Sequence, residues 1–232
     1  MKIESIRLKN FSMFRDVSIN NLPNCCVFVG ANGTGKTSLF DVFRFWRDAL
    51  TYNVKQALAK RGGFQEVVSR GTKGPIELEL KFSDLEAIYS KVTYLLVIDL
   101  VENKPVVKRE VLKYRQGHGE EHFLDFSFGK GMVITHEIGP DNLLVELKRE
   151  EKQLEAPNIL ALKGIGQLTQ FEIANKLRRF IENGHFSDLQ ISEARSVNSA
   201  VGYDEHLSSN GNNLALFART LSQNYPKAIW RN

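Results

Sequence analysis

The chain has 232 residues, of which 42% are hydrophobic and 25% are charged, a balance typical of soluble globular proteins that argues against disordered and membrane-spanning classes. No apolar run approaches the roughly 20 residues that span a bilayer, and the start of the chain lacks the apolar core of a signal peptide, so we expect a cytoplasmic protein with no membrane contact. The net charge of +4 permits contact with nucleic acid without requiring it.

The first elements predicted along the chain are two strands. Residues 1–11 alternate apolar and polar side chains, which indicates a half-buried strand. Residues 25–29 form a short apolar run, which indicates a buried parallel strand. Its adjacent Cys25 and Cys26 would point to opposite faces of that strand, so we expect two small buried thiols without a disulfide, in a reducing compartment.

A glycine-rich loop follows directly and matches the Gly-x4-Gly-Lys-Thr template of a phosphate-binding loop. After it, apolar residues at 39, 42, 43 and 46 recur at helical spacing. Glycines let backbone N–H groups curl around phosphate oxygens, and the start of the helix adds its positive dipole. In such loops the lysine reaches the β- and γ-phosphates and the threonine hydroxyl ligates Mg²⁺. The expected nucleotide-binding residues are Gly30, Ala31, Asn32, Gly33, Thr34, Gly35, Lys36, Thr37 and Ser38, with Thr37 as the metal ligand.

The nucleotide is predicted to be ATP. GTPases read guanine with an Asn-Lys-x-Asp motif, but residues 103–106 read Asn-Lys-Pro-Val and lack the aspartate. The chain also contains no Asp-x-x-Gly sequence for a GTPase switch. Guanine specificity is therefore disfavoured.

The N-terminal residues resemble a known group of ATPases. A strand ending in Lys9-Asn10-Phe11 precedes the glycine loop by about twenty residues, and residues 39–45 follow it as a Leu-Phe-Asp-Val-Phe-Arg-Phe helix. This combination is similar to the ABC-type ATPase heads of the RecF, SMC and Rad50 group, and most of all to the AAA15 and OLD-like ATPases. Many of these relatives carry a basic residue where Ser12 stands. The resemblance is specific over residues 1–47 and looser beyond them.

The middle of the chain predicts an antiparallel meander. Residues 75–82, 91–101 and 105–114 are three β-rich runs, and residues 102–104 form a turn between the second and the third. The meander resembles the antiparallel subdomain of an ABC-type first lobe, and residues 64–71 before it also look like the family.

Asp99 ends a run that resembles a Walker B strand. We favour the alternative, an exposed side chain on a half-buried meander strand, and predict that Asp99 is not catalytic. Residues 118–122 are expected to form a solvated turn rather than a metal site.

The C-terminal third offers weaker candidates. Gln167, with Gln170 behind it, stands near where ABC-type heads place a glutamine that ligates Mg²⁺, but a surface glutamine before the expected helix over residues 171–182 fits equally well. That helix carries a basic cluster that suits either DNA phosphates or a solvated face, made of Lys176, Arg178 and Arg179. Residues 141–155 are charged and suggest a short helix.

Ser208 has two interpretations. Residues 207–211 resemble the ABC signature Leu-Ser-Gly-Gly-Gln without its glycine pair, whereas residues 210–215 resemble a segment found in AAA15-like proteins. We favour the second. No Asp-Glu pair after an apolar strand follows in the sequence, so we expect the acid that orients the attacking water to come from elsewhere.

Together these patterns predict an α/β P-loop NTPase, the first lobe of an ABC-type head, with a parallel or mixed core sheet and an antiparallel β-meander subdomain. We expect one incomplete domain over residues 1–232: strand, loop and first helix in 1–60, the meander in 61–140, and a mostly helical part in 141–232. The resemblance implies a head that dimerises around ATP and Mg²⁺, with itself or with a partner lobe, and that is coupled to DNA in repair or phage defence. The alternative is a nucleotide-binding sensor or assembly module. The chain alone is expected to hydrolyse ATP very poorly.

Overall fold

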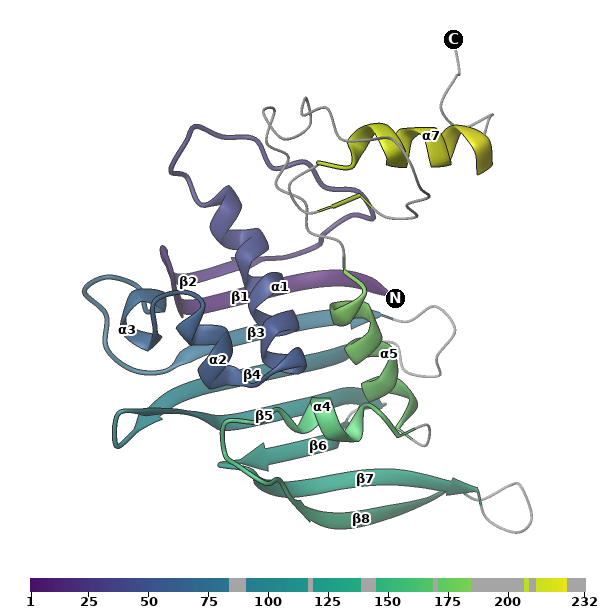
Figure 1. Cartoon of the computed structure of the whole chain (residues 1–232). Helices are drawn as coiled ribbons and strands as arrows, with labels where there is room; N and C mark the ends of the chain where they lie inside the picture. The colour runs from purple at the N-terminus through teal and green to yellow at the C-terminus, as the bar shows by residue number, and fades with distance from the viewer. Residues whose placement is uncertain are drawn as a thin grey trace. The chain divides into compact units, whose positions relative to one another are not determined.

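A computed structural model describes residues 1–83, 91–116, 119–138, 145–168, 171–184, 207–208 and 212–224. The chain divides into two compact units, Met1–Glu182 and Asn183–Asn232. The described part of the second unit consists mainly of helix α7 (Leu214–Asn224). The other described helices and the described strands lie in the first unit (Figure 1). None of the helices in the described ranges combines the length and the apolar character that crossing a membrane requires.

One antiparallel sheet organises the first unit. Its strands lie in the order β2-β1-β3-β4-β5-β6-β7-β8, and each neighbouring pair is antiparallel. The strands are β1 (Lys2–Phe11), β2 (Phe14–Ile19), β3 (Ile76–Ser83), β4 (Val92–Val101), β5 (Lys104–Gln116), β6 (Gly119–Ser127), β7 (Lys130–Ile138) and β8 (Val145–Gln153). The predicted first strand and the predicted meander are therefore confirmed. The meander is continuous with β1 and β2 on one side and with β8 on the other, so it is part of a larger sheet.

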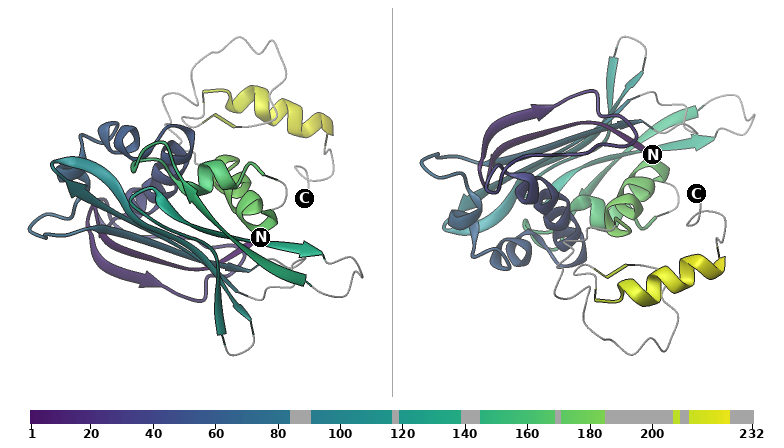
Figure 2. Two further views of the ribbon diagram at one scale, coloured as in Figure 1. Left: turned by 90° about the horizontal axis from the view of Figure 1, so that it is seen from below. Right: turned by 90° about the horizontal axis from the view of Figure 1, so that it is seen from above.

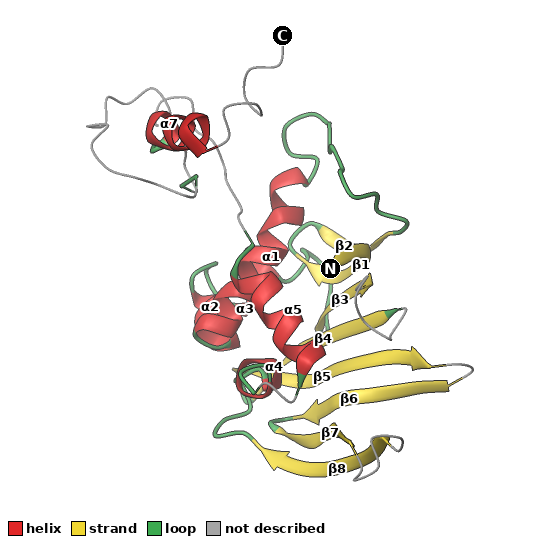
Figure 3. Ribbon diagram, turned by 90° about the vertical axis from the view of Figure 1, so that its right-hand side faces the viewer, coloured by secondary structure: helices red, strands yellow, loops and turns green. Residues whose placement is uncertain are grey.

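The helices of this unit cover one face of the sheet, as Figures 2 and 3 show. They are α1 (Lys36–Thr51), α2 (Val54–Ala59), α3 (Phe64–Val67), α4 (Ala161–Ile165) and α5 (Glu172–Glu182). Alternate strand residues such as Leu78, Leu80 and Leu96 are fully buried beneath them, and α1 adds Phe45 and Trp46 to the same core. The apolar periodicity after the glycine loop thus correctly predicted α1, and α5 was predicted as well.

Three predicted elements are wrong. Residues 119–122 begin strand β6 instead of forming a solvated turn. Residues 25–29 do not form a strand, because no described strand provides backbone hydrogen bonds to them; Val27 and Val29 are 82% and 90% exposed, and both cysteines are exposed rather than buried. The parallel core is accordingly not among the described strands. Residues 145–153 form the edge strand β8 instead of a helix. Its Lys and Glu residues suit a sheet edge, where charged side chains discourage further pairing.

Candidate functional site

The glycine-rich loop leads straight into α1. Gly33 and Gly35 have φ values of 82° and 95°, in the left-handed region that glycine adopts without strain. Gly35 is the N-cap residue, and in the described chain no side chain caps this helix and no acid lies in its first turn. The first backbone N–H groups of α1 are therefore left for an external acceptor, and the helix dipole favours an anion there.

Lys36 extends back across the loop. Its Nζ donates hydrogen bonds to the carbonyl oxygens of Gly30 (2.6 Å) and Ala31 (2.7 Å). The Thr34 hydroxyl donates to the same Ala31 oxygen at 2.9 Å. The ammonium group is thereby held over the curled backbone, where it adds a positive charge to that of the helix N-terminus.

Thr37 fits the role of a metal ligand. It is exposed at the start of α1, and within the described residues its hydroxyl makes no hydrogen bond. Mg²⁺ prefers oxygen ligands and is usually held by one or two protein groups together with phosphate oxygens and waters. The loop, Lys36 and Thr37 therefore fit an Mg²⁺-bound nucleotide phosphate, and the structure brings the residues predicted for this site together.

The turn between β1 and β2 lies against the same loop. The Ser12 Oγ donates to the Ser38 Oγ at 3.2 Å. A methyl group added at Gly35 would overlap the Met13 sulfur, with the Phe14 ring close by. The position where relatives carry a basic residue is thus next to the start of α1, and here it holds a short hydroxyl.

A cavity of about 390 Å³ begins at this turn. Its lining includes Ser12 and Met13, Arg15 on β2, and Arg70 in the segment after α3. Neither arginine forms a hydrogen bond or an ion pair with the described residues. We did not predict this cavity, although the sequence around Arg70 belongs to a segment that resembles the family; only the fold brings that segment next to Arg15.

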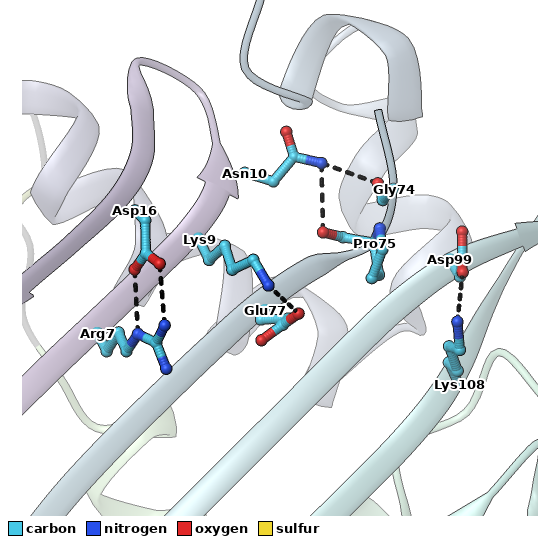
Figure 4. Close-up of polar contacts among 9 residues, drawn as sticks. All are labelled: Arg7, Lys9, Asn10, Asp16, Gly74, Pro75, Glu77, Asp99 and Lys108. Atoms are coloured by element: carbon cyan, nitrogen blue, oxygen red, sulfur yellow. Dashed lines mark hydrogen bonds and ion pairs between the residues drawn. The ribbon is translucent and has the colours of Figure 1, made fainter. Parts of the chain in front are cut away.

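Most other cations of the sheet are paired with acids. Figure 4 shows three of the pairs, from Arg7 to Asp16, from Lys9 to Glu77 and from Lys108 to Asp99. Further pairs are Lys81–Glu79, Arg109–Asp125 and Lys152–Glu150. Arg15 and Arg70 differ from these residues because neither forms an ion pair with the described residues, although Glu66 lines the same cavity.

Asp99 lies on the face of the sheet opposite α1. It is on the antiparallel strand β4, its Oδ2 accepts a hydrogen bond from Lys108 Nζ at 2.9 Å, and its neighbour Ile98 points into the core under the helices. Because side chains alternate along a strand, Asp99 points away from those helices. The prediction that Asp99 lies on an antiparallel strand away from Lys36 is confirmed.

Gln167 is not brought to Thr37. Four residues before it, Lys163 Nζ donates to the carbonyl oxygens of Thr51 and Tyr52, at the C-terminal end of α1. Thr37 lies at the other end of that helix, about 20 Å away at 1.5 Å per residue. Gln167 is exposed after α4, as expected for a surface glutamine. Gln170 lies outside the described residues.

The remaining candidates are local structures. In the second unit, the Ser208 N–H donates to Asn213 Oδ1 at 2.7 Å, just before α7, a contact compatible with both interpretations of that segment. On α5, Lys176 pairs with Glu172 and Arg178 with Glu182, which favours the solvated face. His118 lies outside the described residues, and among those described no cluster of His, Cys, Asp or Glu could hold a metal ion.

A family model described as an AAA ATPase domain matches residues 1–228. A solved structure from work on the "Structural biochemistry of ATP-driven dimerization and DNA stimulated activation of SMC ATPases" is 20% identical, with a TM-score of 0.34, over 52% of this chain and 72% of that one. No curated protein matches the sequence.

Proposed function

Since the chain belongs to the AAA ATPase domain family, we propose that it binds ATP with Mg²⁺ at residues 30–38. The observation that carries this proposal is the uncapped N-terminus of α1 together with Lys36, whose Nζ lies within 2.7 Å of two loop carbonyls. Backbone N–H groups of the loop bind the phosphates, Lys36 neutralises their charge, and the Thr37 hydroxyl ligates the metal.

The cavity beside the loop extends this site. Its volume of about 390 Å³ lies within the range of small-molecule pockets. Arg15 and Arg70 supply two cations against the single carboxylate of Glu66, and neither arginine forms an ion pair with the described residues, so they suit the anionic part of a nucleotide. We propose that ATP occupies this cavity as well as the loop.

The exposed segment before the loop, residues 25–29, suits pairing with a further strand of the ATPase head. Val27 and Val29 are 82% and 90% exposed, and Phe28 lies edge-on against Phe40 of α1. Exposed apolar residues often mark a surface that contacts another segment, and β-branched residues such as valine are favoured in β-strands. We propose that residues 25–29 become a strand of a parallel core when a strand from the rest of the head, or from a partner lobe, pairs with them.

Dimerisation around ATP and coupling to DNA rest on the family resemblance. Several cations of the sheet and of α5 are paired with acids, so we propose that the DNA-coupled roles in repair or phage defence use a surface formed by an assembled head. The second candidate function is nucleotide binding without turnover. It is favoured by Asp99, the acid of the strand that resembles Walker B, which pairs with Lys108 on the face away from α1.

The test is calorimetry of Mg²⁺–ATP binding to the wild type, to Lys36→Ala and to Lys55→Ala, an exposed lysine on α2 that serves as a matched control. We expect binding to be lost only in Lys36→Ala, because that change removes the side-chain cation of the loop. Equal affinity in all three proteins would contradict the proposed site. Steady-state phosphate release then separates the two functions: turnover of about 1 per second, ordinary for an enzyme, would show that the chain contains its own catalytic acid.

A further inference from the structure

Asn10 is a buried polar residue at the end of β1 with an unusual backbone conformation. It is 4% exposed and has a φ of 59°. Its Nδ2 donates to the carbonyl oxygens of Gly74 (2.8 Å) and Pro75 (3.2 Å), as Figure 4 shows. Its Oδ1 accepts from the Ser69 N–H at 3.2 Å and from the Thr72 hydroxyl. Both ends of the amide are therefore bound to one segment, residues 69–75.

These bonds join the two walls of the cavity beside the phosphate loop. On one side is the turn after β1, where Ser12 also has a positive φ, 54°. On the other side are residues 66–70. Two further bonds cross between them, from the Ser12 N–H to the Val67 oxygen (2.5 Å) and from the Ser69 hydroxyl to the Phe14 oxygen (2.8 Å). Left-handed residues other than glycine cost free energy and persist where surrounding bonds fix them.

We propose that Asn10 is a positioning residue for the nucleotide site: by tying residues 10–14 to residues 69–75, it fixes the distance between the cavity walls and thereby the affinity for ATP. The inference rests on the proposed function. The bonds of Asn10 run to residues 69–75, so it acts through Ser12 and Met13, which lie against Ser38 and Gly35. Asparagine suits this position because it tolerates the left-handed region and supplies both a donor and an acceptor.

The first experiment compares Asn10→Gly with the wild type by calorimetry of Mg²⁺–ATP binding. Glycine keeps the backbone conformation and removes every side-chain bond, so any effect reports the bonds. We expect binding about tenfold weaker or more, the effect of losing one or two buried hydrogen bonds. The control is Val133→Ala on β7, which creates a cavity at a fully buried site about 24 Å away across five strand spacings. A merely structural Asn10 would leave the folded protein's ATP affinity unchanged, like the control.

Hydrogen exchange without nucleotide gives a second readout that does not depend on ATP. In Asn10→Gly we expect faster exchange in residues 66–75 and at the Leu39 N–H, which donates to the Gly35 oxygen at the start of α1, with β7 unchanged, and the reverse pattern in Val133→Ala. If the wild type fails to bind ATP, the proposed function is wrong, and the exchange data alone decide the role of Asn10. Wild-type exchange at the Leu39 N–H of Asn10→Gly, or wild-type ATP affinity in a protein that binds, overturns the inference. If Asn10→Gly does not fold, Thr72→Val takes its place in both experiments. This variant removes one hydrogen bond to Asn10, and the expected results are the same.

Discussion

Replacing Glu110 with glutamine should change how the stability of the protein depends on pH. Glu110 is a fully buried carboxyl group on β5. It accepts hydrogen bonds from the Tyr94 hydroxyl (2.9 Å) and from the backbone N–H groups of Ala161 (2.5 Å) and Leu162 (2.9 Å) at the start of α4. Burial raises the pKa of Glu110 from 4.5 to about 7, although these three bonds oppose the rise.

The direction in which stability changes with pH follows from the raised pKa of Glu110. Between pH 4.5 and pH 7 the folded protein holds the Glu110 proton while the unfolded chain has released it. Stability from this group is therefore fully present below pH 4.5 and is lost as the pH rises through 7. The difference between pKa values of 4.5 and about 7, at 1.36 kcal/mol per pKa unit, corresponds to roughly 3 kcal/mol in the free energy of unfolding. Glutamine does not titrate, so the free energy of unfolding of the wild type minus that of Glu110→Gln should fall by about this amount between pH 4.5 and about pH 8.

Urea unfolding followed by circular dichroism across this pH range measures the free energy of unfolding of both proteins. Their difference isolates Glu110, because all other titrating groups are the same in the two proteins and cancel. Glu155→Gln, at an exposed position before α4, is the control and should show the wild-type dependence on pH. A difference that does not change with pH would refute the reasoning. A difference that rises with pH would mean that the three hydrogen bonds outweigh burial.

Four further substitutions test the site. Gly35→Ala places a side chain at φ 95° and against Met13, so urea unfolding should show a loss of more than about 1 kcal/mol and calorimetry should show weaker ATP binding; unchanged values would contradict the described loop. Arg15→Ala and Arg70→Ala should each weaken ATP binding and reduce its dependence on salt concentration, and if neither does so, the cavity is not part of the nucleotide site. Asp99→Asn breaks a partly exposed ion pair, so it should lower the free energy of unfolding by less than about 1 kcal/mol and leave ATP affinity unchanged. A loss of ATP binding would show that Asp99 belongs to the nucleotide site.

Local patterns in the sequence predicted those parts of the fold that local forces determine. Glycine spacing and helical periodicity identified the loop and α1, and alternation identified β1 and the meander. The turn at Glu102 and Asn103 was readable because asparagine is a common turn residue that tolerates a positive φ, and Asn103 adopts a φ of 59°. An apolar run alone could not show whether residues 25–29 have a strand beside them, because pairing depends on distant segments.

The missed features share this dependence on distant partners. Asn10 bonds to Gly74, 64 residues later, and Glu110 bonds to Ala161, 51 residues later. Nothing in the residues around Asn10 indicates that its amide is buried. The charged run of β8 suits a helix surface as well as a sheet edge, and only its register with β7 decides between them.

The strand order has a consequence for how the protein folds. From β3 to β8 each strand pairs with the next one along the chain, so these contacts are local and form quickly. The β1–β3 pairing instead closes the segment between Phe11 and Ile76, which contains the phosphate loop and α1. Closing a segment of this length costs about 4 kcal/mol of chain entropy. Because a ligand that binds only the closed form stabilises it in proportion to the logarithm of its concentration, ATP should slow the release of β1 from β3 more than it slows the opening of any hairpin beyond β3.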